Sequence, residues 1–85
     1  MKIFSLIATF LIFFSGNLFA TPVNINAASA SEIAAALKGI GQSKAEAIVA
    51  FRTENGKFKK ASDIVQVKGI GNSIYEKNKV DILLK

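Results

Sequence analysis

Cysteine and histidine are both missing from this chain of 85 residues. Without cysteine no disulfide can stabilise a small domain, so the fold must depend on a well-packed core. Without histidine the chain cannot form Ser-His-Asp or Cys-His catalytic sites, and the usual nitrogen and sulfur ligands of zinc are lacking. The six carboxylates are scattered, with no paired spacing. These absences argue against an enzyme, and we expect neither a metal nor another cofactor.

Acidic residues are few relative to basic ones. The chain has 11 Lys and Arg against 6 Asp and Glu, a net charge of +5. Residues 21–85 alone keep ten basic and six acidic side chains, a charge of +4. Such a positive charge on a small chain favours polyanionic partners. It also fits a domain that merely needs to be soluble, and charge alone leaves both interpretations open.

The longest apolar run lies at the N-terminus. Met1-Lys2 is followed by an almost unbroken apolar stretch over residues 3–14, and the segment ends in Leu18-Phe19-Ala20. This order is typical of a secretory signal peptide that is cleaved after a small residue. The run is shorter than the roughly 20 residues that a membrane span needs, which disfavours a permanent anchor. We therefore predict a cleaved signal peptide over residues 1–20 and export of the remainder.

A repeat organises the rest of the chain. Residues 37–45 and 67–75 superimpose without a gap at an offset of thirty positions, and both contain Lys-Gly-Ile-Gly followed by a serine. A fixed period indicates that one supersecondary unit is used twice. Apolar runs at helical spacing precede and follow each Gly-Ile-Gly. The pattern predicts two units, each made of a helix, a tight glycine hairpin and a second helix.

Local signals set the expected element boundaries. Residues 21–28 should form an extended lead-in, because proline and the alternating Val and Ile resist helix formation. Ser29 and Glu32 fit a capping box that starts the first helix near Ala30, and Asn55-Gly56 is a strong stop signal for the second. We predict one compact all-α domain over residues 29–85, pseudo-twofold, with helices near 30–38, 42–54, 61–67 and 72–83.

Several apolar residues are assigned to the core. Phe58, in a basic connector between the repeats, is expected to fill the core, and stacking on a nucleobase is the weaker alternative. Ile64 and Val65 are expected to face inward. Asn78 stands in the second repeat where Ile48 stands in the first. The missing apolar surface is therefore expected from the tail: Val80, Ile82, Leu83 and Leu84.

Each hairpin is predicted to bind an anion. Its first glycine suits the left-handed turn at a helix end, and its second glycine allows a ligand to approach the backbone. The next helix begins with N–H groups that lack partners and with the positive end of its dipole. A phosphate is the natural ligand, and plain helix capping is the alternative. The predicted contacts are Lys38, Gly39, Gly41, Gln42, Ser43 and Lys44, and then Lys68, Gly69, Gly71, Asn72 and Ser73. Ile40 and Ile70 are assigned to support, and Arg52, Lys57, Lys59 and Lys60 to general electrostatics.

The segment from Val23 to the C-terminus resembles the ComEA family of competence DNA receptors, which carry tandem helix-hairpin-helix motifs. The resemblance rests on residues 23–26, Gly39-Ile40-Gly41 with Lys44-Ala45, Phe51-Arg52, Asn55-Gly56, Phe58, Asp63-Ile64 and residues 67–71. It implies sequence-tolerant binding of duplex DNA, with one phosphate at each hairpin across the minor groove. It also implies retention of incoming DNA in the periplasm during natural transformation, alongside other parts of the uptake machinery.

Two further points stay open at the level of sequence. Hairpins of this family can hold a monovalent cation on backbone carbonyls, which the sequence neither demands nor excludes. A small helical domain can also serve as a protein–protein interaction module in the cell envelope, with Tyr75 and the apolar tail as its contact surface. In that case the lysines would be dispensable and the hairpins merely structural.

Overall fold

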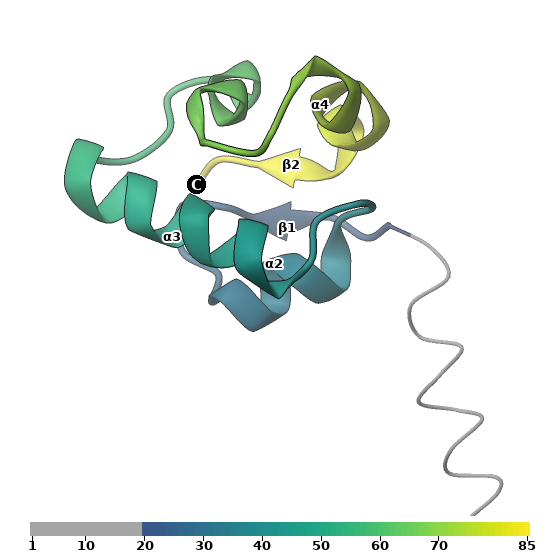
Figure 1. The fold of residues 1–85 in the computed structure, drawn as a ribbon, viewed down its shortest axis with the longest axis horizontal. Coiled ribbons are helices and arrows are strands. Elements are labelled where there is room, and N and C mark those ends of the chain that lie inside the picture. The colour runs from purple at the N-terminus through teal and green to yellow at the C-terminus, as the bar shows by residue number, and fades with distance from the viewer. Residues whose placement is uncertain (1–19) are drawn as a thin grey trace, which may run out of the picture.

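The computed structural model describes residues 20–85, and the predicted signal peptide lies outside the described residues except for Ala20. The described part is mainly helical (Figure 1). Within it, no helix is both long enough and apolar enough to cross a membrane. In chain order the elements are β1 (Val23–Asn24), α2 (Ala30–Ala36), α3 (Gln42–Asn55), the 3-10 helix η1 (Ala61–Gln66), α4 (Asn72–Asn78), the 3-10 helix η2 (Lys79–Asp81) and β2 (Ile82–Leu83).

The first repeat forms as its local sequence predicts. Ser29 caps α2: its hydroxyl accepts a hydrogen bond from the Glu32 N–H at 3.1 Å, and its own N–H donates to the Glu32 carboxylate at 2.8 Å. This reciprocal pair satisfies two backbone donors that a helix start would otherwise leave open. Helix α3 ends where Gly56 takes a positive φ of 89°. The predicted capping box and stop signal are both confirmed.

The two ends of the described chain pair with each other. β1 and β2 lie side by side as a parallel pair, with Val23 opposite Ile82 and Asn24 opposite Leu83 (Figure 1). The lead-in expected over residues 21–28 is a strand at Val23–Asn24, whereas residues 25–27 form a turn in which the Ala27 and Ala28 N–H groups donate to the Asn24 carbonyl. The last helix is shorter than expected. It was expected to reach Leu83, whereas α4 ends at Asn78. Leaving the helix lets the chain pair with β1 and places Ile82 in the core, 7% exposed.

The third predicted helix is a 3-10 helix. At its start the Lys60 N–H donates to the Asp63 carboxylate at 3.2 Å, which satisfies one backbone donor there. The tighter winding turns Val65 outward, 42% exposed, whereas Ile64 is fully buried. The expected inward position of Val65 is therefore wrong. Val80 is also wrong as a core residue, because η2 leaves it 80% exposed.

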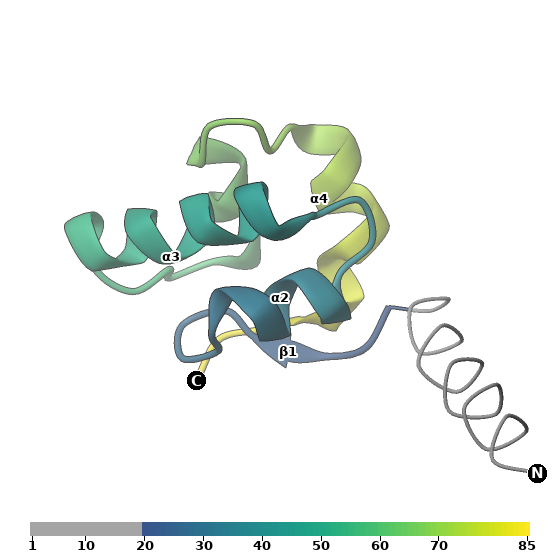
Figure 2. The same ribbon diagram turned by 60° about the horizontal axis from the view of Figure 1, so that its bottom comes forward.

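One core joins both repeats. Phe58 is 4% exposed and its ring stacks on that of Phe51, with 5.3 Å between the ring centroids. Its predicted place between the repeats is confirmed. Figure 2 shows α2 and α3 packed beside each other, with η1 and α4 closing the other side. The buried apolar residues come from both strands, from α2, α3 and η1, and from the hairpins and connector: Val23, Ile25, Ile33, Ala36, Leu37, Ile40, Ala45, Ile48, Phe58, Ile64, Val67, Ile70 and Ile82.

Candidate nucleic-acid interface

The first glycine of each hairpin has a conformation that favours glycine. Gly39 has a φ of 73° and Gly69 a φ of 91°, and both follow the end of a helix. L-residues other than glycine adopt this left-handed region at a cost, so the local sequence explains the turn. Between the glycines, Ile40 and Ile70 are each 3% exposed. Their side chains attach both hairpins to the core.

The second glycine of each hairpin is different, because the fold itself does not require it. Gly41 and Gly71 have φ values of −83° and −101°, in the extended region that any residue adopts. A Cβ at either position would meet no atom of residues 20–85 within 4 Å. Both are the N-caps of the following helices, α3 and α4, and neither helix has a side-chain cap. The absence of a side chain therefore leaves both helix starts open from outside.

The residues after these glycines lie at the surface. Ser43, Asn72 and Ser73 are exposed. Gln42 is exposed as well, and its amide donates to the Glu46 carboxylate at 3.1 Å. Part of the hydrogen-bonding capacity of Gln42 is thus used within α3, whereas backbone N–H groups in the first turn stay available.

Lys44 belongs to the first repeat but lies against the second hairpin. A Cβ at position 69 would be 3.7 Å from Lys44 Cε and 3.8 Å from its Cγ. The first turn of α3 is therefore next to the second hairpin, as Figure 2 also shows. The equivalent residue of the second repeat is Ile74, which carries no charge. Spacing along the sequence places Lys44 at the first hairpin alone.

The hairpin lysines are not neutralised by partners. Lys38 and Lys68 are exposed and Lys44 is half-buried. Within residues 20–85 the one ion pair joins Lys79 to Glu76, at 2.9 Å on the outside of α4. Glu76 raises the pKa of Lys79 through a hydrogen bond and its charge. The positive charge of the hairpin lysines is thus free to act on an external ligand.

The first hairpin has a contact beyond its own turn. Both hairpins contain the same tight turn, at residues 38–39 and 68–69, and in the second the Ile70 N–H donates to the Val67 carbonyl at 3.0 Å. In the first, the buried side chain of Asn78 also bonds to both backbone groups of Lys38. Sequence reasoning noted that Asn78 replaces an apolar residue, but it missed this contact.

The other basic residues lie elsewhere. The connector with Lys57, Lys59 and Lys60 follows the C-terminal end of α3, whereas the first hairpin precedes its start (Figure 2). A 14-residue helix is about 20 Å long, so the connector is far from the first hairpin. Arg52 is half-buried and its Nη1 donates to the Ile25 carbonyl at 2.8 Å. Arg52 therefore holds the lead-in in place, a role beyond general electrostatics.

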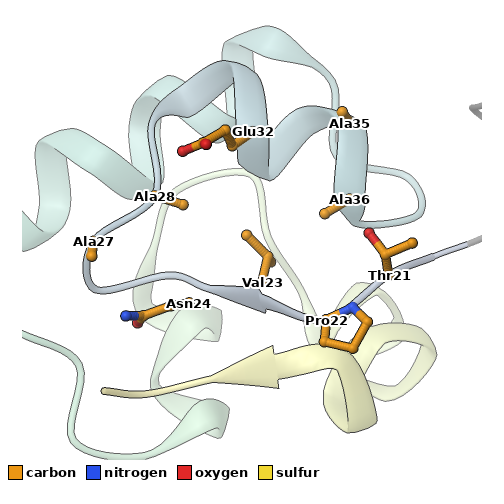
Figure 3. A pocket seen from close by; sticks show the side chains of 9 residues that line it. All are labelled: Thr21, Pro22, Val23, Asn24, Ala27, Ala28, Glu32, Ala35 and Ala36. Carbon is orange, nitrogen blue, oxygen red and sulfur yellow. The ribbon is translucent and has the colours of Figure 1, made fainter.

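A separate hollow lies between β1 and α2 (Figure 3). Its one charged lining residue, Glu32, is occupied in the capping box. It contains no residue of either hairpin, and within residues 20–85 no three acidic side chains gather as a metal site. The hollow is lined by Thr21, Pro22, Val23, Asn24, Ala27, Ala28, Glu32, Ala35 and Ala36.

Comparison with known proteins agrees with this architecture. Residues 19–82 match the helix-hairpin-helix motif family. The chain is 49% identical over 63 residues to ComE operon protein 1 of Bacillus subtilis, which covers 74% of this chain and 30% of that protein. It is also 49% identical over 61 residues to an uncharacterized protein of Haemophilus influenzae, covering 72% of this chain and 54% of that protein. The chain thus spans about a third to a half of the length of these relatives.

Three observations indicate the same family: the repeated hairpins, the core that they share, and the family match over residues 19–82. The chain belongs to the helix-hairpin-helix family and, within it, to the ComEA type.

Proposed function

We propose that this protein binds duplex DNA through the phosphate backbone, with one phosphate at each glycine hairpin. Its role would be to retain DNA outside the cytoplasmic membrane during natural transformation. The family supports the DNA-binding part, and the name of the B. subtilis relative supports the link to competence. The apolar N-terminal segment supports export to the periplasm.

The proposal rests on one observation: the fold itself does not require glycine at position 41 or at position 71. Their φ values suit any residue, and a Cβ would find open space at both. A side chain there would extend outward, across the uncapped start of α3 or α4. Backbone N–H groups at a helix start bind phosphate well, provided that the phosphate can approach closely. Glycine at both positions preserves that approach.

The chemistry of the site favours contacts that ignore base sequence. Backbone N–H groups, lysines and small polar side chains bind phosphate oxygens, which are the same for every base pair. Lys38, Lys44 and Lys68 add positive charge at the hairpins. The minor groove of B-DNA is about 6 Å wide, and two neighbouring hairpins can contact the phosphates on its two sides. Affinity should fall steeply with salt, because bound counterions are released.

The alternative of a protein–protein interaction module finds less support. Its expected contact surface was Tyr75 with the apolar tail. Tyr75 and Leu84 are partly buried against the core, and Ile82 is buried. These side chains thus stabilise the fold, and Val80 alone stays largely exposed.

Fluorescence anisotropy with two unrelated duplexes, each at several salt concentrations, tests the proposal. We expect similar affinities for both duplexes and a decline with salt. Gly41→Val and Gly71→Val should each weaken binding by about tenfold, the equivalent of one charge-assisted hydrogen bond of ~1.5 kcal/mol. The double variant Lys59→Gln/Lys60→Gln is the control, since it removes two charges but leaves the hairpins intact. Full binding by a folded double-glycine variant would contradict the mechanism.

A further inference from the structure

Asn78 is the buried polar residue of the described chain. Its side chain is 0% exposed, and its amide group makes three hydrogen bonds. Oδ1 accepts from the Lys38 N–H at 2.8 Å, while Nδ2 donates to the Lys38 carbonyl at 2.8 Å and to the Ile74 carbonyl at 2.9 Å. Forty positions separate Asn78 from Lys38. The last residue of α4 is thus bound to the backbone of the first hairpin.

The fold does not need an amide at this place for packing. The equivalent position of the first repeat holds Ile48, which is 0% exposed in α3. Burying an amide is costly unless its hydrogen bonds are made, whereas an aliphatic side chain carries no such cost. The asparagine at position 78 is therefore explained by its hydrogen bonds to the backbone of Lys38.

The two hairpins differ in how they are held by the rest of the domain. Both contain the same tight turn, at residues 38–39 and 68–69. In the first, the Asn78 amide also pairs with the backbone of Lys38, at the start of the turn. The Lys38 N–H is thus bonded, whereas residues 20–85 offer no partner to the Lys68 N–H.

We propose that Asn78 is a positioning residue for DNA binding, which acts by holding the first hairpin in its binding shape. This inference rests on the proposed function. Lys38 directly precedes Gly39, so fixing both of its backbone groups fixes the entry to the turn. The hairpin then presents Gly41 and the start of α3 without a loss of conformational freedom on binding.

Asn78→Leu tests this, and Asn26→Leu is its matched control. The Asn26 amide also pairs with both backbone groups of one residue: it accepts from the Phe58 N–H at 2.7 Å and donates to the Phe58 carbonyl at 3.1 Å. Phe58 lies in the connector, which follows the end of α3, whereas the first hairpin precedes its start. Both variants remove one amide and leave the net charge unchanged. We expect Asn78→Leu to weaken duplex binding by about fivefold and Asn26→Leu by less than about twofold.

Double variants distinguish an effect of Asn78 on the first hairpin from an effect on the stability of the whole domain. With Gly41→Val, which blocks the first hairpin, Asn78→Leu should weaken binding no further. With Gly71→Val, which leaves the first hairpin as the binding site, Asn78→Leu should keep its full effect. Any other pattern, including equal losses in both backgrounds, would overturn the inference. Failure of the wild-type protein to bind either duplex would instead overturn the proposed function.

Hydrogen exchange provides a test that needs no DNA. In the wild-type protein the Lys38 amide should exchange at least tenfold more slowly than the Lys68 amide, although both lie in exposed hairpins. Asn78→Leu should remove this difference, and Asn26→Leu should preserve it. Equal exchange of the two amides in the wild-type protein would overturn the inference even if Asn78→Leu fails to fold.

Discussion

The aliphatic chain of Lys44 lies against Gly69, with Cε 3.7 Å from the place that a Cβ would take. This contact joins the first turn of α3 to the hairpin of the other repeat. Because the second repeat has Ile74 at the equivalent position, Lys44 supplies charge at a hairpin that has no following lysine of its own. One cation thus lies between the two proposed phosphate sites.

Lys44→Gln should therefore weaken duplex binding more than Lys59→Gln, although each removes one charge. The glutamine keeps part of the aliphatic contact with Gly69 and loses the ammonium group. We expect the slope of log affinity against log salt to fall by about 1, as for one lost phosphate contact. Anisotropy titrations of both variants across salt provide the comparison. Equal effects would indicate that Lys44 acts only through net charge.

The four hairpin glycines should divide into two classes in stability measurements. Alanine at position 39 or 69 must adopt a positive φ, at a cost of about 1–2 kcal/mol. The space near Gly69 is sufficient, so strain in the backbone is the cause there. Gly41→Ala and Gly71→Ala need no such conformation and should change the free energy of unfolding by less than ~0.5 kcal/mol. Urea denaturation followed by circular dichroism measures all four, and a large loss at position 41 would contradict the open geometry.

Arg52 should matter more to the fold than the connector lysines do. Its Nη1 holds the Ile25 carbonyl at 2.8 Å from a half-buried position. Arg52→Gln should lower the free energy of unfolding by about 1–2 kcal/mol, as expected for a hydrogen bond from a charged donor. Lys57→Gln removes the same charge from an exposed side chain and should have an effect below ~0.5 kcal/mol. Similar losses in both variants would show that the Ile25 contact adds nothing.

Features encoded over a few residues could be predicted from the sequence. The capping box joins Ser29 to Glu32, and the turn at Gly56 follows directly from Asn55-Gly56, because these signals act within one helical turn. The hairpins were also predictable, since their sequence occurs twice. The core position of Phe58 was predictable because Phe58 is the one aromatic residue among the lysines of the connector.

Features that depend on distant partners could not be predicted. The pairing of Val23 with Ile82 joins two-residue strands from opposite ends of the domain, too short to leave a periodic pattern. The contact of Asn78 with Lys38 depends on how the repeats pack, and so does the approach of Lys44 to Gly69. Spacing along the chain identifies which residues belong to a hairpin, but not which residues support it from the other repeat.

Phe58 allows a direct test of whether an aromatic residue of the connector contacts bases. Its ring is 4% exposed and stacks on Phe51, so it has no free face for a nucleobase. Phe58→Leu should reduce the free energy of unfolding by about 1–2 kcal/mol, because a smaller side chain leaves a void in the core. Duplex affinity of the folded variant should stay within about twofold of the wild type, since stacking on bases would be worth ~1–3 kcal/mol. A loss of tenfold or more, with folding intact by circular dichroism, would mean that Phe58 leaves the core to contact DNA.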